Sequence, residues 1–149
     1  LCLNRMNKEQ LNETILSKQN KNDTDKVLVF NTYKNISKKQ LISILFKVSN
    51  IVNKKMFRYF KKYPDKRIIF YTFPQIAHNN THAHVIAKIP EEYDRTEVLN
   101  LIEKTWKKFD DRQQTRFKLY NEDARTVTGN VLYSSRQFSN KDPDSFLMI

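Results

Sequence analysis

The sequence predicts an α+β domain in which an antiparallel β-sheet carries helices mainly on one face. Segments rich in β-branched and aromatic residues alternate with segments whose apolar residues recur every three or four positions. Two of the strand-like segments follow one another across a short polar stretch, as in an antiparallel hairpin. The resulting order of strand, helix, strand, strand, helix, strand and helix favours one sheet with helices packed on it, and 149 residues suffice for one such domain.

The first third of the chain contains one predicted strand and one long predicted helix. Residues 1–26 are polar and are expected to form an arm or a short helix. Residues 27–33 are β-branched and aromatic, which predicts the first strand. Ser37 is a suitable N-cap, and the apolar periodicity after Lys38 predicts an amphipathic helix that continues through residues 53–63.

The middle of the chain is predicted to be a β-hairpin. Residues 67–73 form a strongly β-type segment and predict the second strand. We expect a loop over residues 74–80, because it begins with a proline. Residues 81–89 predict the third strand, which ends at Pro90 because proline has no N–H for a β-ladder.

The last third is predicted to contain two helices and a strand. Asp94 with Glu97 has the spacing of a capping box and precedes a helix over residues 95–109. Residues 115–120 alternate in polarity and predict the fourth strand, and residues 123–138 predict the last helix.

Composition limits the function. Twenty-seven lysines and arginines against 16 acidic residues give a net charge of +11, which favours nucleic acid as a partner, although a lysine-rich solvated surface would give the same count.

The sequence also excludes several classes of protein. The single cysteine, Cys2, excludes a disulfide framework and suggests a cytoplasmic protein. No apolar run is long enough to suggest a membrane span. The only glycine, Gly129, excludes a glycine-rich phosphate loop. We expect the domain over residues 27–140, before a tail at 141–149.

One stretch of the predicted long helix combines basic and aromatic residues. We expect it to contact phosphates and bases through the residues Lys54, Lys55, Arg58, Lys61 and Lys62, helped by Lys88 and Lys107. The alternative is a cationic helix end, where lysines favour the negative pole of the helix dipole and the aromatic rings cover the core. The sequence supports both interpretations equally.

The three histidines fall within seven residues, from His78 to His84. On a strand, His82 and His84 project from the same face and can bind one ion, while Ala83 points into the opposite face. Gln75 and His78 offer further ligands, and an amide or water oxygen beside imidazole suits Mn²⁺ or Mg²⁺. The alternative is an exposed or hydrogen-bonded histidine pair without a metal.

A polar stripe on the predicted last helix contains a candidate nucleophile. Asn130, Tyr133, Arg136 and Gln137 share one face by their spacing of three and four residues. Arg136 is positioned to hold a phosphate or to lower the pKa of Tyr133. Alternatively, Tyr133 is an ordinary packing residue.

These motifs, in this order, resemble the HUH endonuclease superfamily, named for its His-hydrophobic-His motif. The resemblance covers residues 27–138, is most specific at His82-Ala83-His84, and is nearest to a single-tyrosine rolling-circle replication initiator of phage or plasmid type. It implies a ferredoxin-like or RRM-like domain. It also implies His82, His84 and a third polar residue, for which we favour Gln75, as ligands of Mn²⁺ or Mg²⁺. Tyr133, with Arg136, would then attack a DNA phosphate and form a 5′-phosphotyrosine.

The resemblance implies partners and leaves alternatives open. The substrate would be single-stranded DNA or a DNA origin hairpin, in the host cytoplasm, with a host replication helicase as a possible partner and no membrane. A relaxase or transposase has the same local chemistry. A nuclease that activates water instead of a tyrosine is a further alternative, and so is a non-catalytic nucleic-acid-binding α+β module.

Overall fold

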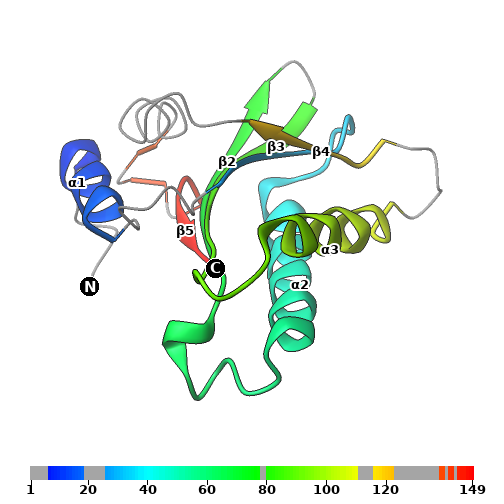
Figure 1. Ribbon diagram of the computed structural model, residues 1–149. Helices are drawn as coiled ribbons and strands as arrows, with labels where there is room; N and C mark the ends of the chain where they lie inside the picture. The colour runs from blue at the N-terminus through cyan, green and yellow to red at the C-terminus, as the bar shows by residue number, and fades with distance from the viewer. Residues whose placement is uncertain are drawn as a thin grey trace.

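The computed structural model confirms the α+β fold class (Figure 1). It describes residues 7–18, 26–77, 80–110, 116–122, 138–139, 141–142 and 144–149. Within them, one five-stranded sheet has the order β4-β1-β3-β2-β5 with every neighbouring pair antiparallel, compatible with a ferredoxin-like fold. The elements are α1 (Lys8–Lys18), β1 (Lys26–Asn31), α2 (Lys38–Met56), a 3₁₀ turn (Pro64–Lys66), β2 (Ile69–Ala77), β3 (Asn80–Lys88), α3 (Arg95–Lys107), β4 (Lys118–Glu122) and β5 (Leu147–Met148).

The main core lies between the sheet and the pair α2 and α3, on the side that we call the helix face. Alternate residues of the central strands point into it and have no exposed surface, because successive side chains of a strand lie on opposite faces. Trp106 of α3 packs edge-on against Phe30 of β1, with ring centroids 5.1 Å apart. The fully buried members include Leu28, Phe30, Phe70, Ala83, Val85, Leu41, Leu45, Val98 and Trp106.

A second, smaller core lies on the opposite side of the sheet, which we call the histidine face. Leu11 of α1 packs there with Tyr71, Phe73 and Ile86 from the sheet and with Phe146 from the C-terminal segment. In Figure 1, α1 accordingly lies on the other side of the sheet from α2 and α3. The prediction that helices pack mainly on one face therefore holds for α2 and α3, and α1 is the exception.

The predicted starts of α2 and α3 are both confirmed. The Ser37 hydroxyl accepts a hydrogen bond from the Gln40 amide at 3.1 Å, and the Gln40 side chain accepts one from the Ser37 amide at 2.9 Å, which is a complete capping box. The Asp94 carboxylate accepts a hydrogen bond from the Glu97 amide at 2.8 Å. Side-chain caps of this kind satisfy amides that have no partner in the first helical turn.

The long helix ends at Met56, so its predicted continuation through residue 63 is wrong. Phe57 has an extended backbone, with φ −153° and ψ 106°. The physical reason lies one turn earlier, at Asn53, whose side chain is buried. Its Nδ2 donates to the Ile68 carbonyl at 3.1 Å, and its Oδ1 accepts from the Ile68 amide at 2.8 Å. This pair of bonds joins the end of α2 to the start of β2 and requires the chain to turn back between them.

The second strand is longer than predicted, because it continues through Pro74 to Ala77. Pro74 is opposite Ala83 of β3. On its other side β2 pairs with β5 only at Tyr71 and Thr72 within the described residues, so the ladder there does not need an N–H from Pro74. The expected loop over residues 74–80 is therefore wrong for residues 74–77 and for Asn80, which begins β3, and Gln75 lies in a strand.

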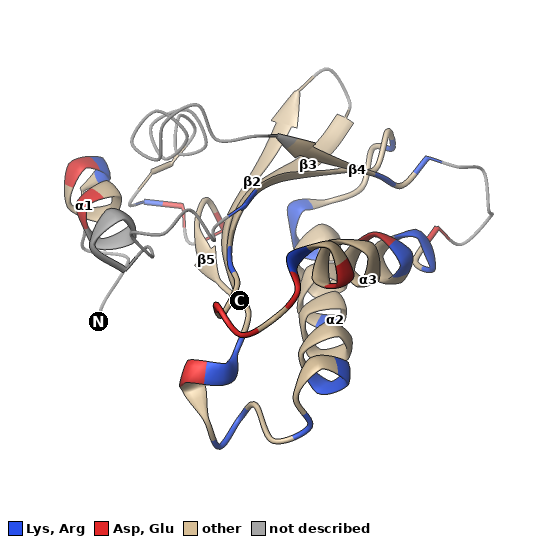
Figure 2. Ribbon diagram, in the orientation of Figure 1, with Lys and Arg blue, Asp and Glu red and all other residues tan. Residues whose placement is uncertain are grey.

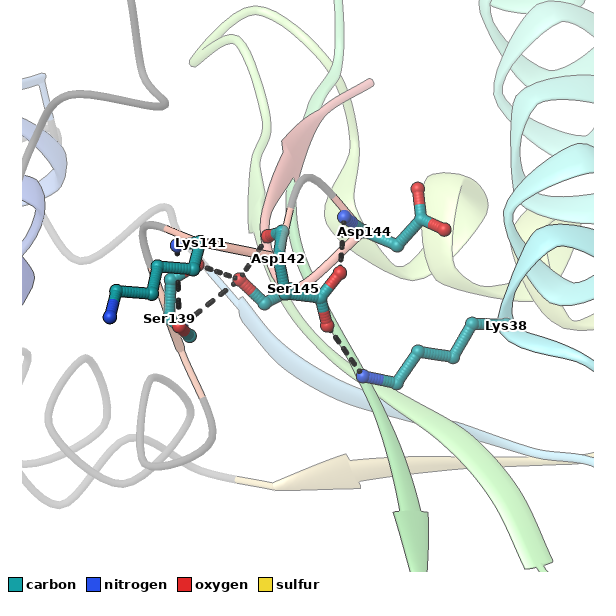
Figure 3. A network of polar contacts seen from close by, with 6 residues as sticks. All are labelled: Lys38, Ser139, Lys141, Asp142, Asp144 and Ser145. Carbon is teal, nitrogen blue, oxygen red and sulfur yellow. Dashed lines mark hydrogen bonds and ion pairs between the residues drawn. The ribbon is translucent and has the colours of Figure 1, made fainter.

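The predicted C-terminal tail adds a strand and a polar network that the sequence pattern did not indicate. Leu147 and Met148 form β5, and the backbone of Ile149 exchanges two hydrogen bonds with Phe70, at 2.7 and 2.9 Å. Figure 3 shows the network before β5, whose residues are Lys38, Ser139, Lys141, Asp142, Asp144 and Ser145. Lys38 at the start of α2 forms an ion pair with Asp142 at 3.3 Å, and the Ser145 hydroxyl donates to the carbonyls of Ser139 and Asp142 at 2.8 Å. The end of the chain is thus attached to both α2 and β2.

Candidate metal centre

The β2–β3 register brings two of the predicted ligands face to face. Gln75 of β2 is directly opposite His82 of β3, and Phe73 is opposite His84. Directly opposite residues in an antiparallel pair have Cβ atoms about 5 Å apart and project from the same face. Gln75, His82 and His84 therefore share the histidine face, although the sequence alone predicted a loop around Gln75.

The two imidazole rings lie close enough to bind one ion. Their centroids are 5.3 Å apart and their planes are inclined by 74°. Two imidazole nitrogens that bind an ion at about 2.1 Å, with an angle between right and tetrahedral, hold their ring centroids roughly 5 Å apart. The separation of the His82 and His84 rings is therefore compatible with two ligands of one ion.

The three side chains lie in a largely buried environment. Gln75 has 0 % of its surface exposed, His82 has 8 % and His84 has 5 %. The Nδ1 atoms of both imidazoles are buried. Electrostatic interactions are stronger where water is excluded, so a charge held here would act more strongly on a neighbouring group than it would at the surface.

The strand between the histidines is held by the main core. Ala83 stands between them, faces α2 and α3, and has no exposed surface, as the sequence predicted. On the other side of the sheet, Phe73 packs against Phe146 with ring centroids 4.9 Å apart and ring planes inclined by 47°. The backbone that carries the imidazoles is therefore fixed on both faces by packing.

A third strand adds a polar residue that sequence analysis did not single out. Asn31 of β1 is opposite His82, on the side away from Gln75, so His82 has an amide residue on each flank. The signal was present in the first strand, since Val27, Val29 and Asn31 occupy alternate positions and the last of them is polar. Asn31 is a further candidate oxygen donor beside the histidines.

Asn31 also positions an exposed tyrosine at this end of the sheet. Its Oδ1 accepts a hydrogen bond from the Tyr33 amide at 2.9 Å, and Tyr33 has a left-handed backbone with φ 47°. Asparagine side chains stabilise turns by bonding to the backbone two residues on. The Tyr33 hydroxyl forms a hydrogen bond with the hydroxyl of Tyr120 on β4, and this bond raises the pKa of Tyr33.

The Tyr33 loop is attached to the start of the histidine strand. The Thr81 amide donates to the Lys34 carbonyl at 3.1 Å, and the Thr32 hydroxyl donates to the Thr81 carbonyl at 2.8 Å. Thr32 and Thr81 are fully buried. Since Thr81 immediately precedes His82, these bonds hold the tyrosine pair beside the candidate metal centre.

The basic residues predicted to bind DNA are not brought to the histidines. Five of them cluster at and beyond the end of α2, whereas the histidine end of β3 bonds to the chain just before α2 begins (Figure 2). A helix of 19 residues is about 28 Å long. The cluster residues are Lys54, Lys55, Arg58, Lys61 and Lys62. Lys88 is on the histidine face, but four residues beyond His84, which is roughly 13 Å along the strand.

Three predicted site residues lie outside the described part of the chain. They are His78, Tyr133 and Arg136. Of the predicted last helix over residues 123–138, all but Phe138 lies there too. Among the residues that are described, no three histidine, cysteine, aspartate or glutamate side chains form a group that could hold a metal ion. Within this part of the chain, a three-ligand centre at the histidines therefore needs an amide such as Gln75.

Comparison of the chain with protein-family models, with curated proteins and with solved structures found no match in any of the three. The resemblance to the HUH superfamily thus stays a prediction from the sequence. No helix among the residues described by the structure has the length and apolar character needed to cross a membrane.

Proposed function

We propose that this protein is a metal-dependent endonuclease that nicks single-stranded DNA and holds the cut end on a tyrosine. His82, His84 and Gln75 would bind Mn²⁺ or Mg²⁺, and Tyr133 would be the nucleophile with Arg136 beside it. A rolling-circle replication initiator acting in the host cytoplasm, on an origin hairpin and with a host helicase, is the specific version of this proposal. A relaxase or a transposase would use the same residues.

The observation that supports the proposal best is the position of Gln75 opposite His82, with His84 on the same face. The centroid distance of 5.3 Å between the imidazoles fits two ligands of one ion. One amide oxygen and two imidazoles are a suitable donor set for Mn²⁺, and water would complete the coordination.

The chemistry follows from these donors. A divalent ion polarises a phosphoryl oxygen and stabilises the negative charge that builds up during displacement. The Tyr133 oxygen would form a bond to phosphorus, the bond from phosphorus to the 3′ oxygen would break, and the tyrosine proton would pass to that leaving oxygen. Arg136 would bind a non-bridging oxygen. The released 3′ hydroxyl could prime synthesis, and the phosphotyrosine keeps the bond energy for a later transfer.

The test is formation of a covalent adduct on labelled single-stranded DNA in the presence of Mn²⁺. We expect the wild-type chain to form the adduct, and His84→Ala and Tyr133→Phe to lose it, whereas Tyr59→Phe, in the exposed segment that follows α2, retains it. Absence of any adduct would refute the proposal, as would an adduct that persists in Tyr133→Phe. Cleavage without an adduct in both the wild type and Tyr133→Phe would identify a nuclease that activates water instead.

A second candidate function, a non-catalytic module that binds single strands, is favoured by a different observation. Tyr33 and Tyr120 form an exposed pair at the histidine end of the sheet, and neither residue needs a metal to contact a base. The same adduct assay separates the two candidates, because such a module would bind the DNA but never cut it.

A further inference from the structure

A groove of about 570 Å³ lies between the C-terminal half of α3 and the edge strand β4. One part of its lining is aromatic and apolar, from Phe117, Leu119 and Tyr120. The other part is cationic, from the residues Lys104, Lys107, Lys108 and Lys118. Figure 2 shows this basic region on α3 and β4, apart from the basic end of α2.

Contacts with neighbouring elements fix Phe117 and Lys118 in the lining of the groove. The Trp106 indole N–H donates to the Lys118 carbonyl at 3.1 Å, which ties α3 to β4. Phe117 stacks on Trp106 with ring centroids 4.6 Å apart, and the Lys34 ammonium lies 5.2 Å from the centre of the Phe117 ring. These contacts are present without a ligand. Binding in the groove would therefore lose little side-chain entropy.

The acidic residues of the groove are neutralised within the protein. The Asp110 carboxylate accepts hydrogen bonds from the amides of Arg116 at 2.8 Å and Phe117 at 3.4 Å, and forms an ion pair with Lys34 at 3.5 Å. Burial alone would raise the pKa of Asp110, but these bonds and the lysine charge lower it below its usual value. Glu103 pairs with Lys107 at 2.9 Å.

The remaining charge of the groove is positive. No ion pair within the described residues involves Lys104, Lys108 or Lys118. Three ammonium groups around an aromatic wall match a ligand that has both negative charge and flat apolar surfaces. A nucleotide strand has both, in its phosphates and its bases.

The groove ends at the tyrosine pair of the candidate metal centre. Tyr120 lines the groove and bonds to Tyr33, and the two side chains are 42 % and 47 % exposed. Tyr120 is opposite Val29, which is opposite His84, so two strand spacings, roughly 10 Å, separate Tyr120 from the histidine strand. Because α3 lies on the helix face, whereas Tyr120 and His84 lie on the histidine face, a single strand seated in the groove reaches the histidines by passing around the β4 edge at Tyr120.

We propose that the α3–β4 groove is the principal binding groove for single-stranded DNA. Bases stack on the exposed ring of Tyr120. Lys104, Lys108 and Lys118 hold phosphates, and the Tyr33–Tyr120 pair directs the strand toward His84. This inference names the binding surface for the proposed nicking activity and rests on that function only for the identity of the ligand. It replaces the basic end of α2 as the main contact.

Binding is measured with the full chain and a labelled oligothymidylate in EDTA, so that metal chemistry contributes nothing. Lys104→Ala combined with Lys118→Ala is expected to weaken binding about tenfold and to lower the slope of log affinity against log salt by about 1.4. The matched control is Lys61→Ala with Lys62→Ala at the α2 end, which is expected to have a smaller effect. An equal or larger loss in this control would overturn the proposal, and so would an unchanged affinity in the groove variant.

Stacking is tested by a second matched pair. Tyr120→Leu keeps an apolar side chain but removes the ring, and is expected to weaken binding about fivefold or more, whereas Tyr59→Leu at the α2 end is not. Photocrosslinking with iodouracil-substituted DNA should attach the strand to the peptide that contains Phe117 and Tyr120. Attachment at Tyr59 instead would contradict the proposal.

The two proposals of this article fail separately. If the wild-type chain forms no adduct, or Tyr133→Phe still forms one, while the groove variants lose DNA binding, the groove proposal stands and the tyrosine-nucleophile proposal does not. If adducts form normally in the groove variants at low DNA concentration, the nuclease stands and the groove does not. A groove that receives a peptide strand along β4 would leave DNA binding unchanged in the lysine variants.

Discussion

Gln75 lies directly across the hairpin from His82, and its side chain is completely buried. An amide in this position stands on the face of the sheet that also carries His84. If the Gln75 side chain is a metal ligand, a substitution that removes its oxygen should weaken metal binding, and one that replaces the amide with a carboxylate should strengthen it. A purely structural glutamine would affect stability alone.

Substitution of Gln75 should therefore have opposite effects with two replacements. Gln75→Leu is expected to weaken Mn²⁺ binding about tenfold or more, because one donor is lost. Gln75→Glu is expected to strengthen it, because a carboxylate is a harder, charged donor. Calorimetric titration with Mn²⁺ measures both.

The same pair of variants gives a second measurement in thermal unfolding. Without metal, Gln75→Glu should have a lower Tm than the wild type, because the new carboxylate is buried. Saturating Mn²⁺ should recover that loss, since a ligand that binds only the folded state stabilises it. A Tm of Gln75→Glu that does not respond to Mn²⁺ would contradict the predicted ligand set.

The buried side chain of Asn53 should contribute strongly to stability. It forms four hydrogen bonds, to the amide and carbonyl of Ile68 and to the carbonyl and hydroxyl of Ser49. Asn53→Leu leaves the Ile68 groups without this partner and is expected to lower the free energy of unfolding by about 2–3 kcal/mol. Urea denaturation measures it, with Asn50→Ala on the exposed side of α2 as a control expected to change stability by less than about 0.5 kcal/mol.

The capping box of α2 should stabilise the protein by a smaller amount. Ser37→Ala removes the hydroxyl that accepts the Gln40 amide and is expected to reduce the free energy of unfolding by about 1 kcal/mol. Ser43→Ala, at an exposed position inside the same helix, keeps the cap and should be neutral or slightly stabilising. Equal losses in the two variants would show that the cap is not the cause.

The hydrogen bonds and the ion pair of the Asp110 carboxylate predict that the stability of the protein falls in acid. Its folded-state pKa lies below the unfolded value of about 3.9, so its ionised form stabilises the protein above that pH. The contribution is lost as the pH falls from about 4 through the folded-state pKa. Asp110→Asn should be less stable at pH 7 and should lose less stability on acidification, whereas the exposed Asp65→Asn should follow the wild-type profile. Unfolding midpoints in urea from pH 7 to pH 2.5 measure this.

Local signals in the sequence were sufficient for much of the fold. Ser37 and Asp94 mark the helix starts because capping depends on residues only three positions apart. His82, Ala83 and His84 alternate between faces because a strand has a period of two residues. The order of these elements, read with the hairpin between them, was enough to predict an antiparallel α+β arrangement.

The errors occur where a distant partner decides the structure. Pro74 reads locally as a loop residue, but it is tolerated in β2 because the short β5 does not extend to it. Leu147 and Met148 have no pattern of their own and become a strand only by pairing with β2. The approach of Tyr120 to Tyr33, which no sequence spacing encodes, likewise depends on the pairing of β4 with β1.

The full burial of Ala83 has a consequence for how the candidate site can vary. The Ala83 side chain between the two histidines lies in the main core and has no exposed surface, so a larger residue there is expected to displace the helices or the strand. Displacing the strand would change the separation of the imidazoles on its other side. The distance between the two imidazole rings therefore depends on packing at the helix face of the sheet. A larger side chain at Ala83 would change this distance without touching either histidine.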